Sequence, residues 1–505
     1  MADWLFLGMA IVNVVPVWAW TYFPSQDGPS HLYNSFVLAH YRDSALLQQY
    51  YRLHWSPAGN ALTHALFPAL LLVFSPLLAQ RIFLTLYCAG LPFAFRYAVR
   101  SWNRSDDVMS FAGFLLIYNV FLHYGFWNFC FSIVLFLVAF GYLARHAATV
   151  TWRVAGWMTL LSFATYLAHI LSWIMLVLAA SVLFLDAFVR REWKRLPLLG
   201  VATLLPGILA LLYFWAATAG PNGGALTGPM TLRQRLWSLY GFPFLRGFTY
   251  AETDFAACVV AFALALLVAV VWRYWRQHRQ LPWNTGFSLC AICVLLTIAS
   301  PANGNFLQSR IALYAFLFLL LGMAAIGEFG RATPLVRAVL IGLSIAGILL
   351  RIGPYRHWNE VLTEYTQAGD YVASDSTLLP VRFVADQDGS LRPTLHAAGL
   401  FIPKVFVDLY DYEAAVDYFP VQFQPNRFPK DTLGWTNEFD RFPPLFRPRL
   451  YEQATGGRVD YILVEVSGTA ADPWPERKYS ASALADYRLV YMSHPHGLVH
   501  LYRRR

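Results

Sequence analysis

The sequence is poor in charged residues and has few cysteines. Of its 505 residues, 57% are hydrophobic and 13% are charged, whereas soluble domains carry about 25% charged residues. This deficit excludes an ordinary soluble enzyme as a description of the whole chain. All five cysteines lie within apolar stretches, and none follows Cys293. The C-terminal part must therefore fold without disulfides.

Motifs that identify common enzymes and nucleic-acid-binding proteins are also missing. No Walker A, GxSxG, HExxH or GxGxxG motif stands in a usable context, so ATP-driven transport and serine hydrolysis lack support. The net charge is +9, but Lys and Arg occur in short runs between apolar segments and not in a basic helix or zinc finger. A nucleic-acid partner is therefore not expected.

Metal-ligand spacing is not evident either. Cys290 and Cys293 form a CxxC, but their setting, FSLCAICVLLTIAS, is an apolar run without a second ligand pair. A metal or redox role for this pair is therefore not expected. The sequence predicts no cofactor and no metal site, although acidic residues that could hold a divalent ion are present.

Long apolar runs are what the sequence does contain. A helix that crosses the hydrocarbon core needs roughly 20 mostly apolar residues. The first run lacks a basic segment before it and a small-residue cleavage site after it, which indicates a retained transmembrane helix rather than a signal peptide. The sequence predicts eleven spans, at about 4–23, 80–99, 108–123, 125–144, 152–169, 170–189, 196–216, 255–273, 284–300, 308–327 and 334–352.

A twelfth apolar segment, 60–77, decides the orientation. If this segment does not cross the membrane, every basic cluster between the spans falls on the same side. The positive-inside rule then puts the N-terminus in the cytoplasm and the C-terminus outside. Segment 60–77 is expected to be re-entrant or interfacial, which suits Pro68 and Pro76. The basic clusters are Arg96, Arg100 and Arg104; Arg145 and Arg153; Arg190, Arg191, Lys194 and Arg195; Arg273, Arg276 and Arg279; Arg331 and Arg337.

This orientation predicts two domains. Residues 1–353 should form a polytopic α-helical membrane domain, and residues 354–505 a small mixed α/β domain outside the cytoplasm. In the first external loop, 24–58, apolar and polar residues alternate with helical spacing. This pattern predicts an amphipathic helix on the membrane surface.

The tail after about Gly369 changes in character. Runs such as YVASDS, PKVFVDLY and DYILVEV are typical of strands, as is the C-terminal run YRLVYMSHPHGLVHLYRRR. Helical stretches are expected near 410–417 and 480–486, and a loop rich in Pro, Phe and Asn over 419–449. Together these patterns predict the mixed α/β fold.

Asp27 is the first candidate for chemistry, because it stands just beyond the first predicted span. A carboxylate at the mouth of a membrane cavity can accept a proton from a hydroxyl nucleophile. The alternative is that Asp27 caps the helix that follows, as the string Asp-Gly-Pro-Ser permits. His31, four residues further on, could bind phosphate or orient Asp27, or it could be structural.

Arg310 and three further histidines also fall near the external face. His64, His123 and His169 could line one cavity, or they could be scattered interfacial histidines. Arg310 stands at the external start of a span, whereas the other arginines at helix ends are on the cytoplasmic side. Ionisable groups at membrane depth usually face a polar cavity or a partner, and arginine binds phosphate oxygens in a bidentate manner. The alternative is an arginine that extends to the interface.

The layout resembles the GT-C superfamily of integral-membrane glycosyltransferases, to which protein O-mannosyltransferases and aminoarabinose transferases belong. The shared features are the N-in first helix, the acidic residue that opens the first external loop, the eleven spans and the external C-terminal domain. A local feature is similar too, since Ala79, Gln80 and Arg81 match the family's Ala-x-Arg between a short apolar helix and a span. The Asp-Glu pair of the mannosyltransferases is Asp27-Gly28 here, so a second carboxylate is missing or lies elsewhere.

The resemblance implies a glycosyltransferase that uses a polyprenyl-phosphate sugar donor. Asp27 matches the family's general base, and Arg310 corresponds by position to its phosphate-binding arginine. His31, His169 and His64 are expected to assist in binding the substrate phosphate. Asp27 and Arg310 are expected to share one pocket at the outer leaflet.

The expected partners are the lipid-linked donor, an acceptor glycan, lipid or protein, and the lipids of a bacterial inner membrane. The alternatives are a lipid or polysaccharide transporter and a non-catalytic protein of envelope assembly. A transporter needs polar residues at the membrane midplane, and the two halves of a transporter sequence are often related to each other as internal repeats. The predicted spans are almost wholly apolar and show no internal symmetry.

Overall fold

A computed structural model of the chain resolves into two compact units, each assembled from separate stretches of sequence. The helical unit comprises Met1–Trp18, Pro57–Leu62 and Leu84–Pro354, and the mixed unit comprises Ala19–Ser56, Thr63–Phe83 and Tyr355–Arg505. The structure describes residues 2–56, 59–102, 107–191, 196–219, 230–249, 251–300, 306–327, 329–384, 391–416, 419–428, 433, 444–466 and 474–505.

Seven helical segments among the described residues are long and apolar enough to cross a membrane. They account for seven of the eleven predicted spans. Helices of this length and composition are typical of a helical membrane protein. They are α5 (Pro76–Trp102), α7 (Trp127–His146), α9 (Ile170–Val189), α10 (Leu196–Leu204) with the start of α11 (Gly207–Ala219), α13 (Ala251–His278), α15 (Leu307–Ile326) and α16 (Thr333–Thr366) with its short flanking turns.

The other four predicted spans are shorter helices. Three are α1 (Ala2–Trp18), α8 (Trp152–Ala168) and α14 (Thr285–Ala299), and the fourth is the 3₁₀-helix η2 (Val108–Leu116) followed by α6 (Val120–Tyr124). The number of spans and their orientation therefore stay predictions. Segment 60–77 contains α4 (Ala61–Leu71), whose 11 residues extend about 16 Å and fall short of the roughly 30 Å hydrocarbon core.

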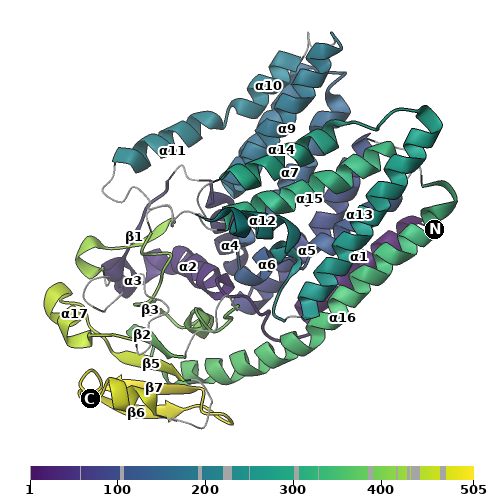
Figure 1. The fold of residues 1–505 in the computed structure, drawn as a ribbon. Helices are drawn as coiled ribbons and strands as arrows, with labels where there is room; N and C mark the ends of the chain where they lie inside the picture. The colour runs from purple at the N-terminus through teal and green to yellow at the C-terminus, as the bar shows by residue number, and fades with distance from the viewer. Residues whose placement is uncertain are drawn as a thin grey trace. The chain divides into compact units, whose positions relative to one another are not determined.

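Close packing of α14 against α15 holds part of the helical unit together, and the two helices lie side by side in Figure 1. A Cβ atom at Gly286 would lie 2.6 Å from the Cα of Gly322, so only glycine permits this approach. Without a hydrophobic driving force in lipid, such contacts between small residues favour association of helices. The remaining elements of this unit are α12 (Leu232–Tyr240), η4 (Pro243–Leu245) and η5 (Gly330–Ala332).

A buried ion pair joins α13 to α16. The Glu252 carboxylate lies 3.0 Å from Nη2 of Arg351, and both side chains are buried. Glu252 also accepts the N–H of Phe248 at 2.7 Å, and Nη1 of Arg351 donates to the carbonyl of Gly347 at 2.7 Å. The two charges are therefore paired and hydrogen-bonded, as burial requires.

Glu252→Gln should lower the stability of the helical unit by about 3–5 kcal/mol, because it leaves the Arg351 charge buried without its partner. The double variant Glu252→Gln/Arg351→Met should recover much of the loss. Thermal unfolding of the detergent-solubilised protein measures both. If the double variant lost as much stability as the sum of the losses in Glu252→Gln and Arg351→Met, the two side chains would not be a coupled pair.

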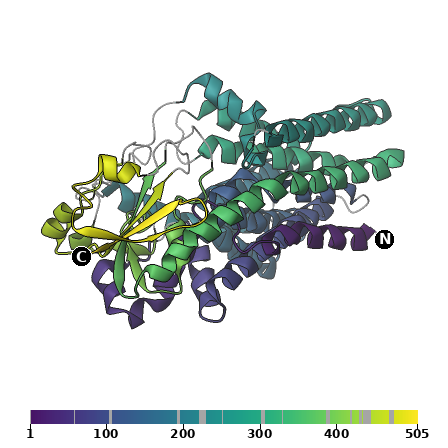
Figure 2. The same cartoon turned by 90° about the horizontal axis from the view of Figure 1, so that it is seen from below.

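A five-stranded sheet forms the centre of the mixed unit, in the order β3-β2-β5-β7-β6. The β2 strand pairs in parallel with β3 and β5, whereas β7 pairs antiparallel with β5 and β6. Figure 2 shows the yellow strands β6 and β7 beside the greener ones. The strands are β2 (Ser376–Phe383), β3 (Phe406–Asp408), β5 (Tyr461–Val466), β6 (Tyr487–Met492) and β7 (Val499–Arg504).

The segment after α1 belongs to this mixed unit. It contains α2 (Gly28–His40), η1 (Tyr41–Asp43), α3 (Ala45–Tyr50) and β1 (Tyr51–Leu53). The β1 strand pairs antiparallel with β4 (Val421–Phe423). Nη2 of Arg81, the arginine of the Ala-x-Arg stretch, donates to the carbonyl of Trp20 at 2.8 Å. Distant parts of the sequence thus share one hydrogen-bonded unit.

Three of the four runs expected to be strands contain strands, but YVASDS (371–376) is mostly irregular, and β2 begins only at its last residue, Ser376. The described part of the expected loop 419–449 includes the strand β4. The expected helices are absent from their described residues. Residues 410–416 and 480–486 form turns. In the first stretch, Oδ1 of Asp411 accepts the N–H groups of Glu413 and Ala414 at 3.1 and 3.3 Å, and such side-chain bonds compete with a helix. The helices are α17 (Pro448–Thr455) and α18 (Pro475–Tyr479), with 3₁₀ turns η6 (Gln367–Tyr371), η7 (Ala397–Phe401) and η8 (Pro425–Arg427).

Candidate functional site

Helix α2 carries the first half of the site, and it is buried to an extent that the sequence pattern does not predict. The ten residues from Gly28 to Val37 are all buried, although an amphipathic surface helix was expected. One reason is its contact with η7, since a Cβ at Gly399 would lie 2.5 Å from the carbonyl oxygen of Pro29. The helix therefore packs backbone to backbone against the C-terminal part of the mixed unit.

Two tyrosine hydroxyls bond the chain around α2 to β3. The Tyr33 hydroxyl donates to the carbonyl of Phe406 at 2.8 Å and accepts the N–H of Asp408 at 2.9 Å. The Tyr51 hydroxyl donates to the carbonyl of Asp408 at 3.1 Å. These bonds pair buried backbone groups at the edge strand of the sheet, and they fix α2 and β1 in register with β3.

The turn after β3 presents acidic residues to α2. Nδ2 of Asn34 donates to Oδ1 of Asp411 at 2.9 Å. The same oxygen accepts the N–H of Glu413. Asp411 therefore both binds α2 and orients Glu413. Burial raises the pKa of Asp411 well above its ordinary value, and raises that of Asp408 to about 7.

Asp27 occupies the N-cap position of α2, but its side chain makes no capping hydrogen bond. The capping alternative is therefore wrong. Oδ1 of Asp27 accepts from Nε2 of Gln26 at 3.2 Å and lies 3.8 Å from Nε2 of His396. Burial raises the pKa of Asp27 to about 7, and the charge of His31 and the hydrogen bond from Gln26 oppose this rise in part. Burial lowers the pKa of His396 to about 3, so this neighbouring ring is neutral.

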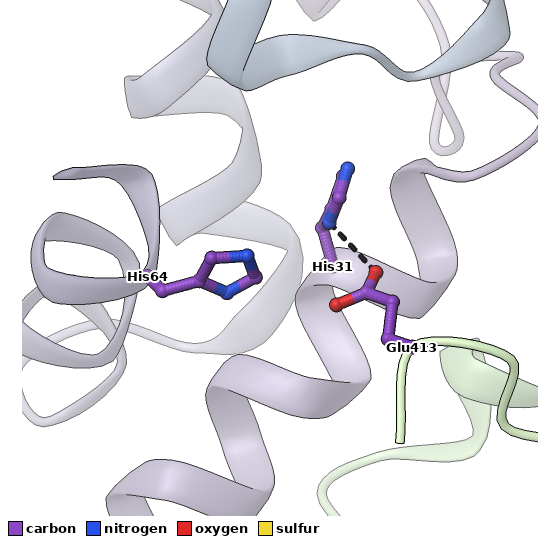
Figure 3. A group of neighbouring side chains, drawn as sticks. All are labelled: His31, His64 and Glu413. Atoms are coloured by element: carbon purple, nitrogen blue, oxygen red, sulfur yellow. Dashed lines mark ion pairs between the residues drawn. The ribbon is translucent and has the colours of Figure 1, made fainter. Parts of the chain in front are cut away.

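His31, His64 and Glu413 lie next to one another, as Figure 3 shows. His31 comes from α2, His64 from α4 and Glu413 from the turn after β3. All three side chains are buried, and their ligand-type atoms lie within 4.8 Å of one another. Nδ1 of His31 lies 2.7 Å from Oε1 of Glu413. The ring of Phe419 packs edge-on against His64, with 5.2 Å between centroids, and forms an apolar wall.

The other two predicted residues meet in the helical unit. Nε2 of His169 lies 3.0 Å from Nη1 of Arg310, and Nδ1 of His169 accepts the N–H of Leu171 at 3.1 Å. The rings of Phe126 and Phe129 lie 4.7 and 5.0 Å from the Arg310 guanidinium carbon, within cation–π range. Arg310 is thus held among a histidine and aromatic rings at the start of α15.

The predicted site residues fall into two groups. Asp27, His31 and His64 belong to the mixed unit, whereas Arg310 and His169 belong to the helical unit. The structure brings together the members of each group. A single pocket shared by Asp27 and Arg310 stays a prediction.

A cavity of about 630 Å³ opens between α7, α9 and α10 in the helical unit. Its lining is almost entirely aliphatic and aromatic, with Ser181 and Thr203 as the polar exceptions. None of the described residues that line it is titratable, and its apolar walls offer space for a hydrocarbon chain.

Sequence reasoning missed Glu413 and His396. Neither stands at a recognisable spacing from Asp27, because more than 350 residues separate them in the chain. One signal was present: the run DLYDYE, residues 408–413, concentrates three acidic groups after a strand in a chain that has little charge. Binding and catalytic residues lie disproportionately on loops that a rigid scaffold positions.

No protein-family model matches the sequence, and no curated protein matches it at a significant level. The resemblance to the GT-C superfamily therefore stays an argument from layout and from individual residues.

Tyr33→Phe should destabilise the mixed unit by about 1–3 kcal/mol, because it leaves the buried N–H of Asp408 without its acceptor. The control is Tyr371→Phe, whose side chain is half exposed in the same unit and whose loss of a hydroxyl should cost little. Thermal unfolding of both variants in detergent gives the comparison. Equal melting temperatures would show that the Tyr33 hydroxyl does not hold α2 to β3.

Proposed function

We propose that the chain is a glycosyltransferase of the GT-C type, which moves a sugar from a polyprenyl-phosphate donor to an acceptor hydroxyl. The observation that carries the proposal is the state of Asp27. Its carboxyl is buried and is not engaged in capping α2, and burial raises its pKa to about 7. A general base works best when its pKa lies near the operating pH, so this carboxylate suits proton transfer from a hydroxyl.

The reaction follows from this assignment. The acceptor oxygen attacks the anomeric carbon, and its proton passes to the Asp27 carboxylate. The bond between the anomeric carbon and the phosphate oxygen breaks, and polyprenyl phosphate leaves with the electron pair. A single attack of this kind inverts the anomeric centre. Positioning and charge stabilisation supply most of the acceleration.

Arg310 is assigned to the phosphate of the donor in this proposal. Its guanidinium offers a planar set of donors that matches phosphate oxygens, and the His169 ring lies 3.0 Å from it. Aromatic rings pack within 4.7 and 5.0 Å of its guanidinium carbon. The apolar cavity between α7, α9 and α10 suits part of an isoprenoid chain.

The proposal includes the topology and location of the protein. The chain crosses a bacterial inner membrane eleven times, with the N-terminus in the cytoplasm and residues 354–505 in the periplasm or an equivalent outer space. The short α4 supports the assignment of segment 60–77 as non-crossing, on which this orientation depends.

Asp27→Asn should lower sugar transfer roughly 10²–10⁴-fold, since a positioned general base contributes about that factor. The assay follows release of polyprenyl phosphate from a panel of labelled polyprenyl-phosphate sugars in membranes that contain the protein. The matched control is Asp43→Asn, an exposed carboxylate on η1 of the same external segment, which should retain full activity. Full transfer by Asp27→Asn would remove the assignment of the base, and no transfer by the natural chain with any donor would remove the proposed function.

Arg310→Gln should lower the transfer rate roughly 10²–10³-fold, as expected when one preorganised group is lost from a developing negative charge. Arg233→Gln is the control, because Arg233 is exposed on α12 of the same unit. Single-turnover rates at saturating donor separate this effect from weaker binding. Unchanged rates with an unchanged melting temperature would exclude Arg310 from the reaction.

A further inference from the structure

The cluster of His31, His64 and Glu413 has features that an ordinary buried histidine pair does not need. Three separate segments, α2, α4 and the turn after β3, each contribute one side chain to it. His64 is 2% exposed and Glu413 is fully buried. The three ligand-type atoms lie within 4.8 Å of one another, so small side-chain movements would let all three contact one ion.

The polar atoms of two members of this cluster, His64 and Glu413, lack hydrogen-bond partners among the described residues. Within the described part of the chain, neither Nδ1 nor Nε2 of His64 has a hydrogen-bond partner. The Glu413 carboxylate accepts no hydrogen bond among the same residues, and its charged contact is Nδ1 of His31. An unpaired buried polar group destabilises the fold, so a buried ring with two such nitrogens calls for a further partner.

We propose that His31, His64 and Glu413 bind a divalent transition-metal ion, with zinc as the ion that fits best. A cation between them would accept a lone pair from each imidazole and offset the buried charge of Glu413. The proposal that these residues bind a metal does not depend on the proposed sugar transfer.

The ligand set selects among metals. Two imidazoles and one carboxylate are borderline ligands that suit zinc, whereas magnesium and calcium prefer oxygen ligands alone. Zinc binds such ligands at about 2.0–2.2 Å, so tetrahedral geometry needs ligand atoms about 3.3 Å apart, and side-chain movements of about 1–2 Å close the site. Three protein ligands leave a fourth position open to water or to an anionic oxygen of a substrate.

The shell around the cluster supports the same assignment. Asp411 orients Glu413 through its hydrogen bond to the Glu413 N–H, and Asn34 of α2 holds Asp411. The Phe419 ring lies against both imidazoles, with centroids 6.1 and 5.2 Å away. Ligands that are oriented by neighbours and enclosed by apolar groups are typical of metal sites.

The test measures metal directly on the full-length protein in detergent, purified through an affinity tag without histidines. The protein is stripped with a chelator, dialysed against ZnCl₂ and analysed by mass spectrometry for zinc, and a chromophoric chelator gives the affinity by competition. We expect about one zinc per chain. His31→Ala, His64→Ala and Glu413→Gln should each weaken binding at least about tenfold.

Matched controls separate a metal site from a structural cluster. His357→Ala, at an exposed histidine of α16, should bind zinc like the natural chain. Glu413→Gln is nearly isosteric, so it should still fold, and the rise in melting temperature that zinc gives the natural chain should be smaller in this variant because its affinity for zinc falls. Cobalt in place of zinc should give a visible absorption spectrum that disappears in His64→Ala.

Two results would overturn the proposal. One is absence of tightly bound zinc in the stripped and reloaded natural chain, and the other is equal zinc affinity in the natural chain and all three ligand variants. Because neither readout depends on sugar transfer, a chain that binds zinc but transfers no sugar would refute the proposed function alone.

Discussion

The buried hydrogen bonds between α2 and the chain around β3 are the constraint on which the candidate site depends. Tyr33 pairs two backbone groups of β3, and Asn34 pairs the Asp411 carboxyl. Because unpaired buried groups are costly, these bonds allow one register between segments more than 370 residues apart. Glu413 lies two residues beyond Asp411, so its position beside His31 follows from that register.

The sequence predicts the long helices well, because a run of about 20 apolar residues has few alternatives to a helix that is buried or spans a membrane. It predicts short elements less well. Around 108–123 an apolar run forms η2 and then α6, and the side chain of Asn119 caps the second of these helices. At 410–416 the Asp411 carboxyl bonds the backbone, and this local contact prevails over helix propensity.

The site could be predicted in part, for a reason that concerns distance along the chain. Asp27 and His31 could be predicted from the sequence because they follow an apolar span within one short segment. Glu413 could not be predicted, because packing and not sequence spacing brings it close to His31. Arg310 was identified by its position at a helix start, whereas its contact with His169, 141 residues away in the chain, follows from the fold.

The buried carboxyls of the mixed unit differ in their surroundings, and this difference separates the proposed base from the proposed metal ligand. Burial raises the pKa of Asp27 to about 7, and a carboxyl in that condition can gain and lose a proton during a reaction. Glu413 instead lies 2.7 Å from a histidine nitrogen and close to a second imidazole, an arrangement of ligand atoms that suits coordination of a cation. Proton transfer and metal binding therefore suit different side chains here, although both side chains lie close to the same helix. This distinction cannot be predicted from the sequence, because it depends on the surroundings of each carboxyl in the fold and not on residue type.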